Sequence, residues 1–487
     1  MRKRVLVQCM RMCVLVIVAT KVVQATPGEK IPVTTKSEEA KKEFLKAREL
    51  FEKLELTNSL QHYDQAIALD PTFAWAHLGR ATAATTAQEF FGHLKAAVAS
   101  SGKVSEGERL LILATDAGST GNAAKQEEYL KKLVTAYPDD ERAQFALGGF
   151  YFGQQNFDQA IAHYRKAISL APNYSPAYNI LGYAYRQVES YDEAEKVFKK
   201  YTELIPNDPN PYDSYAELLL KMGRFDASIA MYQKALAVDK EFIASHIGIA
   251  TNYVYKEMHE KAAEELKSIA KWARTDGERR QALFTQMVVN VDAGKMEEAL
   301  KDVDRQYAMA EKIKDLSQMS GDLGLKAAIL LEMGKHDDAL AAFEKSVQLS
   351  DKSQTTQKQK ENARLFHHFN VATVAIAKND IVTAQRETEQ FRKGAEANKN
   401  QIQMRLVHEL WGRIALAQKE YDKAIAELQQ ANDQNPYNLY RLSLAYQAKG
   451  DKERAKEFSS RAARFNGLPA LNYAFIRMKA EKLIAGA

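Results

Sequence analysis

The chain has 487 residues, of which 46% are apolar and 27% charged, with only 23 Gly and 11 Pro. This balance is typical of a soluble folded chain with several domains, and it excludes wholesale disorder, collagen-like repeats and turn-rich all-β designs. The five bases of residues 1–25, a stretch without acids, account for the whole formal charge of +5. The remainder is formally neutral, so we expect no nucleic-acid partner.

Residues 1–25 are typical of an export signal. A basic start at residues 2–4 precedes an apolar run from Met12 to Thr20, and Val23 and Ala25 are spaced like the small residues before a signal-peptidase cut. The run is about half of the roughly 20 apolar residues that span a bilayer. We expect cleavage after Ala25 and an exported protein, periplasmic in a bacterial envelope or secreted. An uncleaved anchor is the alternative.

Both cysteines, Cys9 and Cys13, lie within this signal. Cleavage would leave a mature chain without disulfides, thiol nucleophiles or cysteine–zinc sites. Its stability would have to come from packing along a long chain.

A period of 34 residues runs through the rest of the sequence. It separates Pro138, Pro172 and Pro206, and also Gly148 and Gly182. Each period holds two amphipathic stretches with apolar residues three and four apart, which predict two helices, and proline ends the second. We predict an all-α superhelical solenoid of tandem antiparallel helix pairs.

The repeat frame predicts first helices that begin near residues 40, 72, 107, 141, 175, 209, 243, 280, 320, 365, 405 and 436. The segment 72–106 is expected to be incomplete, with an unclear second helix. Ser175-Pro176 and Asn210-Pro211 are expected to start helices, with a capping side chain before proline.

These features divide the chain into a signal (1–25), a linker (26–37), an N-terminal array (38–276) and a C-terminal array (277–487). The second array is degenerate, as is the stretch 243–320. Residues 471–483 are expected to form a helix that caps the last repeat.

Several segments repeat the same order of small, aromatic and proline residues. They contain Trp75, Leu78 and Gly79; Leu147, Gly148, Tyr151, Ala160, Tyr164, Ala167 and Pro172; Leu181, Gly182, Tyr185, Ala194, Phe198 and Pro206; and Trp411, Gly412, Ala424, Ala431 and Pro436. This pattern resembles the tetratricopeptide repeat (TPR) family, although Tyr201 and Lys240 depart from it. The resemblance implies a right-handed superhelix with a concave groove.

In the resembled family the groove is lined by first-helix residues at repeat positions 2, 5, 9 and 12, which form one stripe on a helix. Counting from 141, 175 and 209 places aromatic, amide, basic and acidic side chains on this stripe. The candidate peptide- or partner-binding residues are Phe145, Phe152, Asn179, Tyr183, Arg186, Asp213 and Glu217. The aromatic rings have packing between repeats as their alternative role.

The sequence contains no phosphate-binding glycine loop, dinucleotide fingerprint or nucleophile elbow, and its histidines lack zinc-ligand spacing. We therefore expect no catalytic residues, metal or cofactor, and predict a non-enzymatic, exported scaffold whose partner is a protein or peptide. Two alternatives stay open. One is an enzyme or ligand-binding protein with a pocket in 243–320, and the other is a passive envelope spacer.

Overall fold

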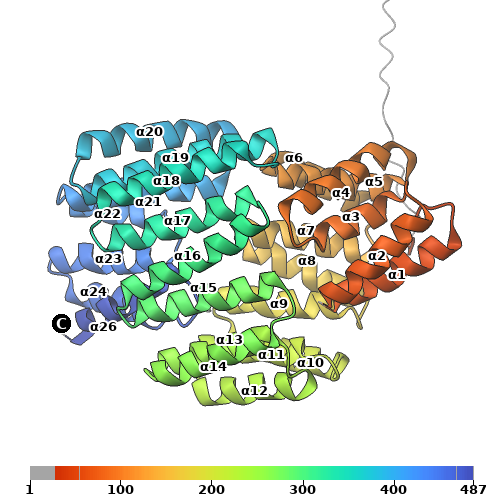
Figure 1. Ribbon diagram of the computed structural model, residues 1–487, viewed down its shortest axis with the longest axis horizontal. Helices are drawn as coiled ribbons and strands as arrows, with labels where there is room; N and C mark the ends of the chain where they lie inside the picture. The colour runs from red at the N-terminus through yellow and green to blue at the C-terminus, as the bar shows by residue number, and fades with distance from the viewer. Residues whose placement is uncertain (1–27, 54, 468, 486–487) are drawn as a thin grey trace, which may run out of the picture.

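The computed structural model describes residues 28–53, 55–467 and 469–485, and over these ranges its regular structure is helical (Figure 1). Helices α1 to α24 form twelve consecutive antiparallel hairpins within this part of the chain, which confirms the all-α solenoid. The expected signal at residues 1–25 lies outside the described residues.

The first helix of each hairpin packs between its own partner and the neighbouring hairpins. These helices are α1 (Glu38–Glu52), α3 (Ala74–Thr82), α5 (Glu106–Ser119), α7 (Glu141–Gly153), α9 (Ser175–Gln187), α11 (Asn210–Lys221), α13 (Ile243–Tyr255), α15 (Asp276–Asp292), α17 (Leu316–Glu332), α19 (Gln357–Ala377), α21 (Gln401–Ala417) and α23 (Pro436–Ala448).

The second helices complete the hairpins, and two further helices follow them. The second helices are α2 (Leu56–Leu69), α4 (Ala87–Ser100), α6 (Ala123–Ala136), α8 (Phe157–Leu170), α10 (Tyr191–Leu204), α12 (Phe225–Val238), α14 (His259–Trp272), α16 (Met296–Lys312), α18 (His336–Lys352), α20 (Ile381–Asn398), α22 (Tyr421–Leu428) and α24 (Lys452–Ala463). A 3₁₀ helix, η1 (Ser101–Lys103), follows α4, and α25 (Leu471–Ala474) and α26 (Arg477–Ala485) end the described chain.

The predicted starts agree with the structure at most hairpins. From α15 to α21 the first helices begin four to eight residues earlier than predicted. Each of these helices has its N-terminus capped by a side chain, that of Thr275, Asp315, Thr356 or Asn400. Apolar periodicity locates the buried face of a helix and not its cap, so it places these starts too late.

Two sequence expectations about single helices were wrong. The segment 72–106 contains a complete second helix, α4, which begins after Thr86, whose hydroxyl accepts a capping hydrogen bond from the Glu89 amide. Ser175 and Asn210 begin α9 and α11, but neither side chain caps its helix. The Asn210 amide oxygen instead accepts the Tyr201 hydroxyl at 2.8 Å, so this side chain is used inside the hairpin stack.

Recurring glycines allow the two helices of a hairpin to touch. A Cβ atom at Gly148 would lie 2.8 Å from Cε1 of Tyr164, and one at Gly182 would lie 2.5 Å from Cζ of Phe198. The two rings are fully buried. A side chain at either position would therefore displace a core aromatic ring.

The N-terminal stretch 28–37 is fixed to the array. The Ile31 side chain is buried, and its amide donates to Asp140 at 2.9 Å. The Thr34 amide donates to Glu108 at 2.9 Å. The part of the expected linker that the structure describes thus packs along α5 and the start of α7.

The C-terminal segment does more than cover the last hairpin. Helix α26 packs against α24, while α25 contacts α15 and α23. The Arg477 guanidinium binds both carboxylate oxygens of Asp292 at 2.6 and 2.7 Å, and both residues are buried. The predicted capping helix is therefore two short helices that also cover α15, 185 residues earlier in the chain.

Segments far apart in the sequence meet because the superhelix curls back on itself. Figure 1 shows α1–α8 on one side, α15–α26 on the other, and α9–α14 below them. Gln359 donates from its amide Nε2 to the Ser119 carbonyl at 3.1 Å, and Arg405 bonds Gln155. Lys221 donates to the Phe465 carbonyl at 2.7 Å. The boundary between the predicted N-terminal and C-terminal arrays, at 276/277, falls at the start of α15. Helix α15 packs on α14 there, so the stack of hairpins continues across this boundary.

Candidate functional site

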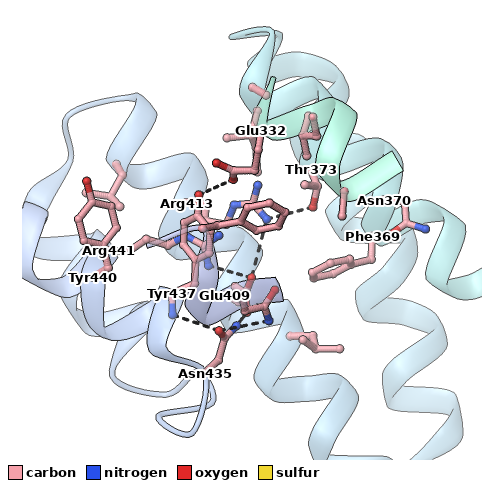
Figure 2. A pocket seen from close by; sticks show the side chains of 18 of the residues that line it. Glu332, Phe369, Asn370, Thr373, Glu409, Arg413, Asn435, Tyr437, Tyr440 and Arg441 are labelled. Atoms are coloured by element: carbon pink, nitrogen blue, oxygen red, sulfur yellow. Dashed lines mark hydrogen bonds and ion pairs between the residues drawn. The ribbon is translucent and has the colours of Figure 1, made fainter. Parts of the chain in front are cut away.

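The C-terminal pocket is a cavity of about 920 Å³ between α17, α19, α21, α23 and α25 (Figure 2). It is lined mainly by apolar and aromatic side chains with a few polar groups among them. The apolar and aromatic residues include Leu331, Phe343, Phe366, Phe369, Ile376, Leu406, Leu416, Tyr437, Tyr440, Leu444 and Phe475. Its volume and lining are those of a ligand- or side-chain-binding pocket.

Two arginines share one buried carboxylate in this pocket. Glu409 is 4% exposed and lies 2.9 Å from Nη1 of Arg441 and 3.8 Å from Nη1 of Arg413. Figure 2 shows both guanidinium groups beside this carboxylate. Arg413 also donates to the Thr373 hydroxyl at 3.0 Å. The two arginines and the glutamate therefore have a net charge of +1.

The pKa directions agree with this arrangement. Burial acts to raise the pKa of Glu409, but Arg441 and Arg413 outweigh it and hold that pKa below its ordinary value. Burial, followed by the charge of Arg441, lowers the pKa of Arg413 to about 10. Glu409 and Arg413 are consequently both charged at neutral pH.

A second acid at the pocket edge is already neutralised. The Tyr437 hydroxyl donates to Glu332 at 2.5 Å, and Lys479 of α26 pairs with the same carboxylate at 2.8 Å. The Arg441 guanidinium lies 4.2 Å from the centre of the Tyr437 ring. Because Lys479 balances Glu332, this acid does not cancel the net positive charge of Arg413, Arg441 and Glu409.

The N-terminal pocket is a cavity of about 350 Å³ lined by residues of α1, α2, α3, α5, α7 and α9 and the turn before α9. Its lining is largely aromatic. The aromatic residues are Phe44, Phe51, Tyr63, Trp75, Phe145 and Tyr174, and the charged ones are Arg48, Glu52 and Arg142.

Five of the seven sequence-predicted binding residues lie together on α9 and α11, and we call them the middle cluster: Asn179, Tyr183, Arg186, Asp213 and Glu217. Their polar groups are largely bonded within the chain. Arg186 pairs with Glu217 at 3.1 Å and lies over the Tyr183 ring. Asn179 accepts from the Ser214 hydroxyl at 3.1 Å. A partner at this surface would meet a preassembled network.

Asp213 is the most enclosed acid of the middle cluster. It is 4% exposed and accepts from the Ser245 hydroxyl at 2.7 Å. Burial, followed by the charge of Glu217, raises its pKa well above the ordinary value. Burial also raises the pKa of Glu217, despite its ion pair with Arg186.

The other two predicted residues, Phe145 and Phe152, lie on α7, and Phe145 shares the lining of the N-terminal pocket with Asn179. Phe145 lines the N-terminal pocket and packs against Tyr164 and Tyr174. Phe152 is half-buried, and its ring contacts Phe157 edge-on at 5.5 Å between centroids. Both rings therefore have packing roles, and Phe145 also faces a cavity.

Family models of the tetratricopeptide repeat match four parts of the chain: residues 139–207, 210–242, 323–353 and 436–466. The matches fall on helix hairpins from both halves of the superhelix. The chain therefore carries multiple tetratricopeptide repeats. TPR arrays are protein-interaction scaffolds, and this chain belongs to that broad class.

Solved structures of other TPR-like proteins are similar over parts of the chain. MamA from Desulfovibrio magneticus RS-1 is 20% identical, with a TM-score of 0.31, over 35% of this chain and 97% of its own. A tetratricopeptide repeat protein from Parabacteroides merdae ATCC 43184 is 18% identical, with a TM-score of 0.36, over 52% of this chain and all of its own. A search of curated protein sequences gives no significant match.

The TPR register explains the C-terminal pocket, which the sequence-based site prediction missed. Counting positions 2, 5, 9 and 12 from residue 405 gives Leu406, Glu409, Arg413 and Leu416, and all four line the pocket. The same count from 365 gives Phe366, Phe369, Thr373 and Ile376, and all four line it too. The sequence therefore carries this signal, outside the three hairpins from 141 to 242 that contain the predicted binding residues.

The degenerate stretch 243–320 borders a much smaller space. A cavity of about 10 Å³ lies between α13, α15 and the segment 469–474. Such a volume holds about one water molecule. Among the residues that the structure describes, there is also no group of three or more His, Cys, Asp or Glu side chains arranged to hold a metal. None of the described helices is both long and apolar enough to cross a membrane.

Proposed function

We propose that the protein is an exported scaffold that binds an extended peptide or a segment of a partner protein on its concave stripe. The observation that carries this proposal is the C-terminal pocket. Its walls come from the groove positions of four successive TPR hairpins, α17 to α24, and it combines aromatic rings with an excess positive charge.

The pocket chemistry defines the partner. Aromatic and aliphatic walls favour a bulky apolar side chain, since burial of apolar surface drives association. The guanidinium groups of Arg413 and Arg441 favour an acidic side chain near it, because a carboxylate balances the charge that Glu409 leaves uncompensated. The fitting partner segment therefore carries an aromatic or long aliphatic residue next to Asp or Glu.

The binding test is selection of displayed peptides on residues 26–487. We expect enrichment of peptides that combine an acid with an aromatic residue, and loss of their binding in Arg413→Gln. The matched control is Arg165→Gln on α8, because Arg165 is exposed and lies outside the lining of both pockets. Enriched peptides that bind Arg413→Gln as well as the native chain would exclude the C-terminal pocket. Failure to enrich any peptide would count against groove binding itself.

Export rests on the N-terminal sequence pattern: a basic start, a short apolar run and the small residues Val23 and Ala25. The test is the intact mass of the full chain expressed in a bacterial host and recovered from the periplasm. We expect a mature chain that starts at Thr26, and retention of the full N-terminus in Ala25→Gln. A full-length, membrane-bound product from the native gene would favour the anchor instead.

A further inference from the structure

The N-terminal pocket is suited to a compact ligand. Its volume of about 350 Å³ falls within the range of small-molecule sites. Its walls combine the rings of Phe44, Trp75 and Phe145 with the aliphatic side chains of Leu78 and Leu111. Flat rings on several sides favour a ring or a short branched chain as the occupant.

Arg48 is the exceptional residue of this pocket. Its guanidinium carbon lies 5.5 Å from the ring centres of both Phe44 and Trp75. Within the described ranges, no hydrogen bond or ion pair joins this guanidinium to another residue. Burial, followed by the charge of Arg142, lowers the pKa of Arg48. A partly buried cation without a bonded anion is stabilised by an incoming carboxylate.

The neighbouring charges are already paired with one another. Arg142 binds Glu52 through Nε at 2.9 Å and Nη2 at 3.2 Å, and it also contacts Glu141. Glu141 in turn pairs with Lys30 at 2.5 Å. Among the charged side chains that line the pocket, Arg48, Glu52 and Arg142 therefore sum to one positive charge.

The ion pair between Glu52 and Arg142 also shapes the pocket. It joins the end of α1 to the start of α7 across 90 residues of sequence. Residues from both sides of this ion pair line the same cavity. A bridge across the groove at this point favours a ligand that fits beside it over a long chain that has to pass it.

We propose that the N-terminal pocket binds a small organic acid in which one carboxylate is attached to an aromatic or branched apolar group. The carboxylate pairs with the Arg48 guanidinium, and the apolar group fills the space between Phe44, Trp75 and Phe145. This site is separate from the C-terminal pocket and does not depend on peptide binding there.

The test uses 3-phenylpropionate as the probe and calorimetric titration of the intact chain. We expect saturable binding of the acid, and binding weaker by about tenfold or more for the neutral 3-phenylpropanamide. Arg48→Gln should weaken binding of the acid by a similar factor and leave that of the amide nearly unchanged. Arg165→Gln is the matched control and should bind the acid like the native chain.

A second variant keeps the test valid if Arg48→Gln does not fold. Ala146 lines the pocket, and Ala146→Phe should fill it and abolish binding while leaving Arg48 in place. Equal affinity for acid and amide, or no binding of the acid at millimolar concentration, would overturn the proposal. Binding of an acetylated Phe-Glu amide without binding of 3-phenylpropionate would also overturn it, in favour of a peptide.

Discussion

Gly148 and Gly149 are neighbours in α7 with opposite surroundings. The Cβ position of Gly148 faces the Tyr164 ring at 2.8 Å, whereas that of Gly149 comes no closer than 3.9 Å to the Tyr164 hydroxyl. Glycine inside a helix costs about 1 kcal/mol relative to alanine. At Gly148 the close packing of Tyr164 offsets this cost in helix stability. Gly148 and Gly149 therefore form a matched pair for measuring the free energy of that packing.

We predict that Gly148→Ala lowers the free energy of unfolding by about 1–3 kcal/mol, because Tyr164 would have to move. Gly149→Ala should raise it by up to about 1 kcal/mol through helix propensity. Urea unfolding followed by circular dichroism measures both. Equal effects of the two substitutions would show that the ring contact does not decide the residue type at position 148.

Asp213 gives the protein a pH dependence at the residue scale. Its pKa is raised by burial, so the folded state binds this proton more tightly than the unfolded state. Between the unfolded and folded pKa values, stability therefore falls as pH rises, and it stays reduced above the folded value.

We predict that Asp213→Asn stabilises the fold, by about 1 kcal/mol or more at pH 8 and less at pH 5. The Asn oxygen still accepts the Ser245 hydroxyl, while the buried charge is removed. Thermal unfolding at the two pH values measures the difference. The exposed Asp192→Asn is the control, and a pH-independent gain for Asp213→Asn would contradict the prediction.

The ion pair between Arg477 and Asp292 links α26 to α15 at the scale of elements. Breaking a buried pair by removing one partner is strongly destabilising, because the other charge stays buried. His259 lies 3.2 Å from the same carboxylate and is the other basic group bonded to it.

We predict that Arg477→Ala lowers the free energy of unfolding by about 3–5 kcal/mol. Asp292→Asn should recover part of this loss in the Arg477→Ala background, since it removes the unpaired charge. Lys482→Ala, an exposed position on the same helix, is the control. The measurement is the urea midpoint, and additive losses in the double variant would argue against a direct pair.

Most elements could be predicted from the sequence, and the failures have definite causes. The 34-residue period locates the hairpins because local spacing determines which helix face is buried. It misses the first turns of α15, α17, α19 and α21, because a capping side chain and not the apolar spacing sets where each of these helices begins. At Asn210 the side chain bonds Tyr201 instead of the helix end, and only the neighbouring helix reveals that choice.

The candidate sites could likewise be predicted only in part from the sequence. Repeat positions identify the residues of the C-terminal pocket, since every first helix turns the same stripe inward. They do not show which polar groups are already paired: Arg186 and Arg413 both occupy groove positions, 12 and 9 of their repeats, yet Arg186 pairs with Glu217 alone while Arg413 shares Glu409 with Arg441. Such differences depend on neighbours from other hairpins.

At the scale of the whole molecule, segments far apart in the sequence touch through both ring contacts and hydrogen bonds. Lys221 of α11 donates to the Phe465 carbonyl, and its ammonium lies 3.8 Å from the centre of the Phe465 ring. These contacts cross 244 residues of sequence, and no repeat pattern predicts them.

We predict that Lys221→Glu opens the superhelix, because a carboxylate at this point faces both a carbonyl oxygen and the face of a ring. Small-angle X-ray scattering should show a larger radius of gyration, with helix content unchanged by circular dichroism. Lys234→Glu on the exposed side of α12 is the control. An unchanged radius for Lys221→Glu would mean that the remaining contacts hold the halves together.

The late position of Arg477 has a consequence for synthesis. The ribosome makes the chain from its N-terminus, and each hairpin can pack on the one before it as it emerges. The partner of Asp292, Arg477, is synthesised 185 residues later, so the Asp292 carboxylate lacks this guanidinium until then. The Tyr255 ring and the Val288 side chain, which pack with the last segment, also stay uncovered until that segment is made. A chain released early would thus display a hydrophobic, acid-bearing face on otherwise folded repeats, a mark by which chaperones and proteases could distinguish it from the finished protein.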